Sequence, residues 1–421
     1  MPYSNATKQA FADADMPSAT DRIIFEAFAE DIVYNSLLLT KTLPNAFIPY
    51  FFPGCYHILT SISEMFDLEL PKTPRERDYK GRFQHFFEIC KQLDRARKSM
   101  QWSTAELCAF LYDFAPKSVG GLHWLWKRLP EPNAVFVIGS SPVEPRFAQA
   151  LAIKSAICWQ GHPDTQPGDI ILLYHWSPES RFASVWRAMA PGFIDPFFVS
   201  YRCVYIGSAI LIDGPTFQDL KADSVWSSHS LVKTRMLKMD GQEIKPSEYA
   251  RIIEILSQKG SNVSQLPSLG AYFERDILSL AIETERDVER CLLEPLLERL
   301  GWRKEQYVRQ MPLRMGRGHT VYPDYAILPK FTPGHERAHW IVEAKKSIPT
   351  KKQLQTDCAQ ASSYALRLNA SGFMLVAREG VWIAQKDDDF NSIQFYCWKD
   401  MQNQDTFASL YAKAGNRRRK R

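Results

Sequence analysis

Three side chains in the C-terminal third have the types and spacing for metal-assisted hydrolysis. Glu343 and Lys345 stand two apart in an apolar run predicted to form a strand, so both project from one face. Asp324 lies on an earlier predicted strand and converges with them if the two strands pair. Two carboxylates and the Ala344 carbonyl make a hard-oxygen site that suits Mg²⁺ or Mn²⁺.

The chemistry of such a site points to phosphodiesters. A divalent ion lowers the pKa of a bound water and neutralises charge that develops on a phosphate. Lys345 is expected to orient the attacking water or to stabilise the transition state. An unpaired Glu343 and Lys345 buried at the end of an apolar strand would be costly, which favours a functional role over a solvated strand end.

The surrounding sequence predicts elements that would position these groups. Glu285 and Glu289 lie four apart on one face of a long predicted helix, and Gln360 and Tyr364 lie four apart on a later one. The predicted elements are a helix over 283–300, strands over 307–315, 321–328 and 339–345, a helix over 352–368, and strands over 372–377 and 381–385.

Five short motifs occur in order along this region. They are Glu285-Arg-Asp-Val-Glu289, Leu300-Gly301-Trp302, Pro323-Asp324-Tyr325, Val342-Glu343-Ala344-Lys345 and Gln360-x-x-x-Tyr364. Together they resemble the PD-(D/E)xK nucleases that carry a Gln-x-x-x-Tyr motif, and in particular the N-terminal nuclease domain of type I restriction enzyme R subunits. The resemblance covers roughly residues 280–390.

The resemblance implies a restriction-endonuclease-like α/β domain with a defined set of site residues. The implied catalytic residues, the last two of which position DNA, are Asp324, Glu343, Lys345, Glu285, Gln360 and Tyr364. The implied metal ligands are Asp324, Glu343 and Glu285, with Glu289 as second choice for the helical position. No Walker A motif occurs in the sequence, so no ATP-driven translocation is expected.

The middle of the chain has a different character. Short apolar runs over 135–138, 169–174 and 202–212, bounded by Gly, Pro and Ser, predict a small β-rich module. The segments Trp159-Gln160-Gly161-His162 and Pro167-Gly168-Asp169 resemble the PUA-like superfamily, especially its EVE branch. That resemblance implies a small β-barrel whose cleft binds RNA or a flipped, often modified, DNA base.

A flipped base needs aromatic walls and polar groups that recognise its edge. The aromatic candidates for base binding are Trp159, Tyr174, Trp176 and Trp186. The alternative is that these side chains pack the core of the module itself. Arg181 and Arg187, on a predicted helix over 178–189, are candidates for phosphate contacts or for a solvated face.

The predicted organisation is multidomain α+β. We expect a helical N-terminal region over 1–130, with a Ser103–Glu106 capping box, a PUA/EVE-like module over 131–262, and a nuclease domain over 263–421. Residues 257–270 have the composition of a linker. The C-terminal tail is either a solvated end or a phosphate-contacting arm formed by Arg417, Arg418 and Arg419.

Composition limits the class of protein. A net charge of +5 over 421 residues permits a nucleic-acid partner without requiring one. The eight cysteines show no zinc-site spacing, which with the lack of a secretory signal favours a reducing cytoplasm. No run of 18 apolar residues occurs, so no membrane span is expected.

These observations predict a Mg²⁺-dependent endodeoxyribonuclease of the modification-dependent restriction or anti-phage defence type. A base reader beside a nuclease implies DNA, in some cases base-modified, as the partner. Cleavage of both strands needs two active sites, so a homodimer is expected. The alternatives are a catalytically silent nucleic-acid-binding protein, an RNA-directed nuclease, and an effector nuclease that a partner activates.

Overall fold

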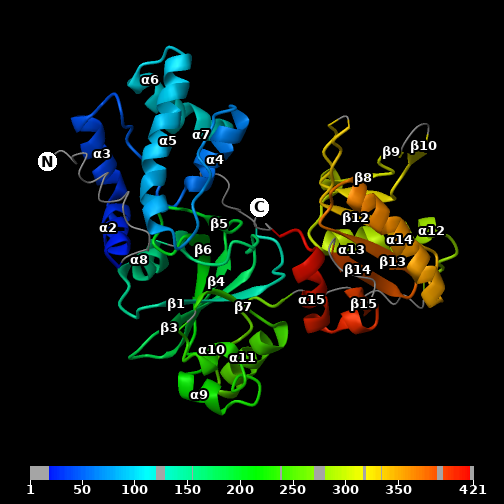
Figure 1. Ribbon diagram of the computed structural model, residues 1–421. Coiled ribbons are helices and arrows are strands. Elements are labelled where there is room, and N and C mark those ends of the chain that lie inside the picture. Colours follow the sequence, from blue (N-terminus) through cyan, green and yellow to red (C-terminus); the bar gives the residue numbers. More distant parts are fainter. Residues whose placement is uncertain are drawn as a thin grey trace. The chain divides into compact units, whose positions relative to one another are not determined.

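A computed structural model describes residues 19–119, 129–153, 155–237, 239–269, 280–315, 319–332, 334–385 and 392–417 (Figure 1). The chain is a mixed α/β protein made of two compact units. The first unit is built from residues up to Leu269, and the second from residues after it together with Lys245–Ser247. No helix in these described ranges is long and apolar enough to cross a membrane.

The first unit begins with helices, as the apolar spacing predicts. They are α2 (Ala19–Glu30), α3 (Ile32–Thr42), α4 (Tyr56–Met65), α5 (Tyr79–Ser99), α6 (Thr104–Ala109), the π-helix η1 (Phe110–Phe114) and α7 (Ala115–Ser118). The expected capping box is present, because the Ser103 side chain accepts from Glu106 N and the Glu106 carboxylate accepts from Ser103 N. Phenylalanines of α2 and α5 supply much of the core.

A seven-stranded sheet follows the helices. Its strands are β1 (Val135–Ser140), β2 (Ile157–Gln160), β3 (Ile170–His175), β4 (Arg181–Ala188), β5 (Phe193–Ile194), β6 (Arg202–Leu211) and β7 (Asp240–Ile244). The order is β2-β6-β4-β3-β1-β7, β5 pairs with β6, and only β1 and β3 run parallel among these described strands. The helix predicted over 178–189 is wrong, because Arg181–Ala188 is the strand between β3 and β6.

The sheet curls until its two edge strands approach each other. Gln160 at the end of β2 donates from Nε2 to the carbonyl of Met239, which precedes β7, at 3.1 Å. A Cβ on Gly241 of β7 would lie 2.2 Å from the backbone nitrogen of His162, so this approach requires glycine. Among the described strands, β2 and β7 share no ladder of backbone hydrogen bonds. The sheet therefore curls toward the predicted barrel but does not close.

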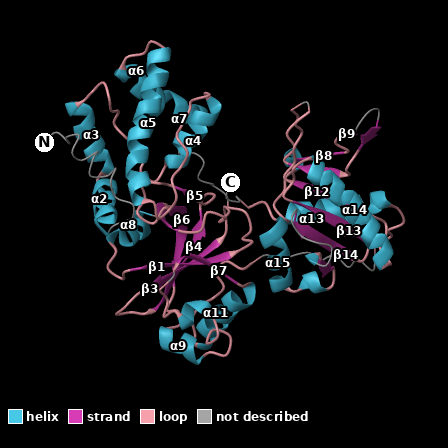
Figure 2. Cartoon of the chain, viewed as in Figure 1, coloured by secondary structure: helices cyan, strands magenta, loops and turns pink. Residues whose placement is uncertain are grey.

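Apolar cores cover both faces of this sheet. One face packs against α8 (Pro145–Ile153), and the other packs against α9 (Phe217–Ala222), α10 (Ser230–Lys233) and α11 (Pro246–Gln258) (Figure 2). The segment predicted as a linker differs from expectation. Residues 257 and 258 end α11, and three later apolar side chains pack against the second core: Val263, Leu266 and Leu269.

One buried arginine joins the helices to the sheet within this unit. Arg82 of α5 is only 1% exposed and donates to the carbonyl oxygens of Glu76, Pro196 and Phe198 at 2.7–2.9 Å. The buried Asp195 accepts from the backbone of Gly54 and of Phe197. The helical region and the sheet, predicted as separate domains, therefore lie in one compact unit.

The second unit is a six-stranded sheet between helices. Its helical elements are α12 (Glu285–Val288), the π-helix η4 (Glu289–Leu293), α13 (Glu294–Arg299), the 3₁₀ helices η5 (Lys304–Gln306) and η7 (Asp400–Gln402), α14 (Lys351–Arg367) and α15 (Gln404–Ala414). Its strands are β8 (Tyr307–Arg309), β9 (Leu313–Met315), β10 (His319–Val321), β11 (Tyr325–Ile327), β12 (Trp340–Ala344), β13 (Gly372–Ala377), β14 (Gly380–Gln385) and β15 (Gln394–Cys397).

The order of that sheet places α14 over its centre. The strands run β15-β14-β13-β12-β11-β8, while β9 and β10 form a separate two-stranded ribbon. Strands β12 and β13 are parallel, and α14 connects them across one face. The opposite face is covered by the consecutive helical elements α12, η4 and α13, and by α15. The strand predicted over 307–315 is thus two short strands, β8 and β9.

Replacement of the buried Arg82 by methionine should cause a large loss of stability. Three carbonyl oxygens, in one buried and two partly buried contacts, would lose a charged donor, which should lower the free energy of unfolding by about 3 kcal/mol. Urea denaturation measures this change. Arg95→Met, at an exposed position on the same helix, should change stability little. Equal effects of the two substitutions would contradict the anchoring role.

Candidate functional site

Strands β11 and β12 bring the two predicted acids together. Tyr325 pairs with Val342 in the antiparallel register, which places Asp324 opposite Glu343. The Asp324 backbone N–H donates to Glu343 Oε1 at 3.0 Å. The Ala344 N–H donates to Asp324 Oδ2 at 2.8 Å. Each carboxylate is therefore held by the backbone of the strand that carries the other.

Lys345 completes this group from the same strand as Glu343. Its Nζ lies 3.6 Å from Glu343 Oε2, and its backbone N–H donates to the carbonyl of Val376 on β13. Ile341 and Ala326 belong to the core beneath α14, so strand alternation places Asp324, Glu343 and Lys345 on the same face. The sequence prediction that these three side chains converge agrees with this geometry.

Burial gives the site unusual electrostatics. Glu343 is 2% exposed, and its burial together with the like charge of Asp324 raises its pKa to about 7. Burial also raises the pKa of Asp324, opposed by the bond from Ala344 and by Lys345. Burial alone would lower the pKa of Lys345, but the surrounding carboxylates, Glu343 first, outweigh it and raise that pKa. The two carboxylates thus lie close together, and the single positive charge of Lys345 does not offset their burial and mutual repulsion.

This donor set suits a hard divalent cation only in part. Two carboxylates that repel each other are natural ligands for Mg²⁺ or Mn²⁺, since such an ion would relieve the repulsion. Within the described ranges, however, no three Asp, Glu, His or Cys side chains are grouped closely enough to hold a metal. Glu285, predicted as the third ligand, is exposed at the first residue of α12 and does not join the pair. Its charge still acts on both Asp324 and Lys345.

The second-choice acid, Glu289, is engaged elsewhere. Its carboxylate forms an ion pair with Arg309 of β8 and accepts from the Tyr325 hydroxyl at 3.3 Å. The Tyr325 hydroxyl also donates to Glu294 at 2.9 Å. Glu289 therefore ties the helix to the sheet at the point where the π-helix η4 begins, a feature that is frequent near functional sites.

Helix α14 contributes polar groups on the face of the site. The predicted pair is in contact, because Gln360 donates from Nε2 to the Tyr364 hydroxyl at 3.1 Å. Gln360 is exposed whereas Tyr364 is buried. Sequence reasoning missed Asp357, which is buried one turn earlier on the same helix. Its spacing of three from Gln360 and seven from Tyr364 is the signal that places all three on one helical face.

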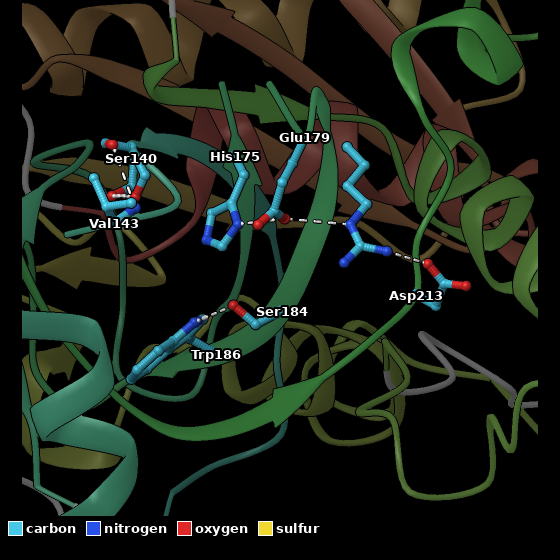
Figure 3. Close-up of polar contacts among 9 residues, drawn as sticks. Ser140, Val143, His175, Glu179, Ser184, Trp186 and Asp213 are labelled. Atoms are coloured by element: carbon cyan, nitrogen blue, oxygen red, sulfur yellow. Dashed lines mark hydrogen bonds and ion pairs between the residues drawn. The ribbon is translucent and has the colours of Figure 1, made fainter. Parts of the chain in front are cut away.

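The four aromatic candidates in the first unit do not form one cluster. Tyr174 belongs to the core on the α11 side of the sheet, whereas Trp159 and Trp186 belong to the core on the other side. Tyr174 and Trp186 are fully buried, and Trp186 donates to the Ser184 hydroxyl (Figure 3). These two are therefore corrected from base-binding candidates to core residues, because they project from adjacent strands into cores on opposite faces of the sheet.

The remaining two aromatic side chains lie near the end of β1. Trp176 is 44% exposed and packs on Gly139, where a Cβ would come within 2.8 Å of the indole. Trp159 donates from Nε1 to the Gly139 carbonyl at 3.2 Å. The Arg146 guanidinium lies 4.4 Å from the centre of the Trp159 ring. An exposed indole and an arginine-covered one thus flank a single glycine.

The predicted phosphate-binding arginines are engaged within the protein. Arg181 pairs with Asp213 and Glu179, and Glu179 also bonds to His175 at 2.9 Å (Figure 3). Arg187 donates to the carbonyl oxygens of Gly168 and Pro130. These contacts fix loops around the sheet.

The predicted C-terminal arm is only partly within the described residues. Arg417 is 8% exposed, with its guanidinium 4.7 Å from the centre of the Tyr411 ring. This side chain packs on the Tyr411 ring of α15 instead of extending as a solvated arm. Arg418 and Arg419 lie outside the described residues.

Comparisons with known proteins give weak likenesses. No protein-family model and no curated protein matches the chain. Rpa0253 from Rhodopseudomonas palustris is 19% identical over 30% of this chain and 94% of its own, with a TM-score of 0.26. Atu2648 from Agrobacterium tumefaciens is 17% identical over 32% of this chain and 99% of its own, with a TM-score of 0.27.

A third solved structure is the YTH domain of the Zygosaccharomyces rouxii MRB1 protein in complex with N6-methyladenosine RNA. It is 15% identical over 31% of this chain and 91% of its own, with a TM-score of 0.22. At TM-scores this low, none of the three likenesses carries a functional conclusion for this chain.

The electrostatics of Glu343 predict a pH-dependent gain of stability in Glu343→Gln. The pKa of Glu343 is raised from 4.5 to about 7, so ionisation of the folded protein is resisted between these values. The wild-type chain should therefore lose stability as pH rises from about 4.5 through 7, and the glutamine variant should not. Above pH 7 the variant should be more stable by about 3 kcal/mol.

Urea denaturation in the presence of a chelator, from pH 4 to pH 8, measures this difference. The same change at the exposed Glu305 serves as control. A stability difference between wild type and Glu343→Gln that stays constant across this range would contradict the assigned burial and repulsion.

Proposed function

We propose that the chain is a metal-dependent endodeoxyribonuclease whose second unit is a PD-(D/E)xK-type nuclease domain. The observation that carries this proposal is the reciprocal backbone bonding of Asp324 and Glu343, with Lys345 on the same face. A buried pair of carboxylates costs free energy, and a sheet that needed only to fold would place apolar side chains there. A role in binding a cation and a phosphate accounts for that cost.

Each side chain of the site has its own role in the proposed reaction. Asp324 and Glu343 would hold Mg²⁺ or Mn²⁺, which when bound supplies Lewis-acid chemistry for hydrolysis of a phosphodiester. Lys345 donates hydrogen bonds to the phosphate and balances charge that develops on its oxygens. The exposed Gln360 amide, held by Tyr364, contacts the DNA backbone at the edge of α14. Glu285 adds negative charge at the rim of the site.

The first unit is proposed to select the DNA. Its curled sheet would act as a PUA/EVE-like reader of a modified base, with the exposed Trp176 as a stacking surface and Trp159 available where Arg146 moves aside. We propose a homodimer acting in the cytoplasm in modification-dependent restriction or anti-phage defence, without ATP. The eight cysteines are all free, as a reducing compartment requires.

Substitutions at the site test the nuclease directly. Lys345→Ala and Asp324→Asn should lower Mg²⁺-dependent cleavage of DNA at least about 100-fold. The first removes the charge that acts on the reacting phosphate, and the second removes a carboxylate that would hold the metal ion. Affinity for DNA, measured by fluorescence anisotropy, should change little. Lys346→Ala removes an exposed lysine next to the site and serves as the matched control. Wild-type rates in either site variant would refute the assignment.

A panel of substrates tests the reader. Duplex DNA that is unmodified, methylated, hydroxymethylated or glucosylated is incubated with the wild-type chain and Mg²⁺, alongside structured RNA. At least one modified DNA should be cut faster than unmodified DNA, and Trp176→Ala should abolish that preference without abolishing cleavage. Equal cutting of all DNAs would remove the reader, cleavage of RNA alone would favour an RNA-directed enzyme, and binding without products would favour a silent binder.

A further inference from the structure

We propose that Asp357 is a positioning residue that holds the Lys345 ammonium at the site from the side of α14. The inference rests on the proposed nuclease function and extends it by one residue that none of the sequence motifs contains. Asp357 is 3% exposed, on the face of α14 that packs against β12 and β13. An acid buried this deeply is rare unless a cation compensates it.

The hydrogen-bond partner of Asp357 on α14 itself is neutral. Gln353, one turn earlier, donates from Nε2 to both carboxylate oxygens of Asp357, at 3.0 and 3.1 Å. That contact fixes the orientation of the carboxylate but leaves its charge in place. In the described ranges no ion pair within 4.0 Å involves Asp357, so a cation that compensates its charge must act from a longer distance.

Lys345 is that cation. Strand alternation places its side chain on the α14 side of the sheet, as it does for Ile341. Glu343, Glu285 and Asp324 act on its charge, and Asp357 adds to them from α14. The Lys345 Nζ lies 3.6 Å from Glu343 Oε2, which is longer than a good hydrogen bond. Glu343 alone therefore does not fix the ammonium, and the Asp357 carboxylate on α14 supplies a second anion.

The arrangement has a functional consequence. Without the charge of Asp357, the ammonium would be drawn onto Glu343 and Asp324, the two groups that would hold the metal. Lys345 would then leave the position from which it acts on the phosphate and would compete with the cation. Asp357 therefore keeps the lysine near the carboxylates without letting it neutralise them.

A double-mutant cycle tests the pairing without any assay of activity. In the wild-type background Asp357→Asn should lower the urea midpoint, because Lys345 loses a compensating charge. In the Lys345→Met background the same change should raise the midpoint, because it removes an uncompensated buried carboxylate. Shifts of the same sign and size in both backgrounds would overturn the proposal.

Kinetics then test the positioning role. Asp357→Asn should lower kcat for DNA cleavage roughly 10- to 100-fold and raise the Mg²⁺ concentration for half-maximal activity, with the KM for DNA unchanged. Asp400→Asn, an exposed position with the same change in net charge, should leave all three values as in wild type. A wild-type kcat and Mg²⁺ requirement in Asp357→Asn would overturn the role even where the cycle shows coupling.

Failure of the two proposals is distinguishable. If the wild-type chain cuts no DNA with Mg²⁺, the proposed nuclease function is wrong. The double-mutant cycle still decides in that case whether Asp357 is coupled to Lys345. An active wild type with additive cycle effects keeps the nuclease and removes Asp357 from its site.

Discussion

The candidate site depends on one constraint, the forced proximity of two carboxylates across a pair of antiparallel strands. Asp324 and Glu343 are each bonded to the backbone of the opposite strand, so neither can move away to relieve its repulsion. Burial strengthens that repulsion because little water screens it. The raised pKa of Lys345 follows from this pairing, and so does the tendency of the two carboxylates to bind a cation.

The rest of the second unit serves to keep that pair in place. One face of the sheet is covered by an apolar core with α12 to α13 and α15, and the other carries the polar site beneath α14. Glu289 holds the first helix to β8 and β11 through Arg309 and Tyr325. Polar side chains thus concentrate at one edge of an otherwise apolar interior, as a site built for charge requires.

Sequence reasoning reached the part of the site that follows from strand periodicity. A spacing of two fixed Glu343 and Lys345 on one face, and a spacing of four placed Gln360 beside Tyr364. It missed Asp357, because which turn of a helix faces a sheet depends on tertiary packing. Its assignment of Tyr174 and Trp186 to base binding failed for the same reason. Strand pairing, which the sequence does not show, places these two side chains in cores on opposite faces of the sheet. The helix predicted over 178–189 is strand β4, because a central strand is buried along most of its length and so shows no clear alternation of apolar and polar residues.

The most direct test of the central claim is anomalous diffraction from crystals of the full chain soaked in Mn²⁺. We expect a Mn²⁺ peak bound by Asp324 and Glu343, and its loss in the Asp324→Asn variant. A soaked crystal with no peak at these two carboxylates, or with an equal peak in the variant, would contradict it.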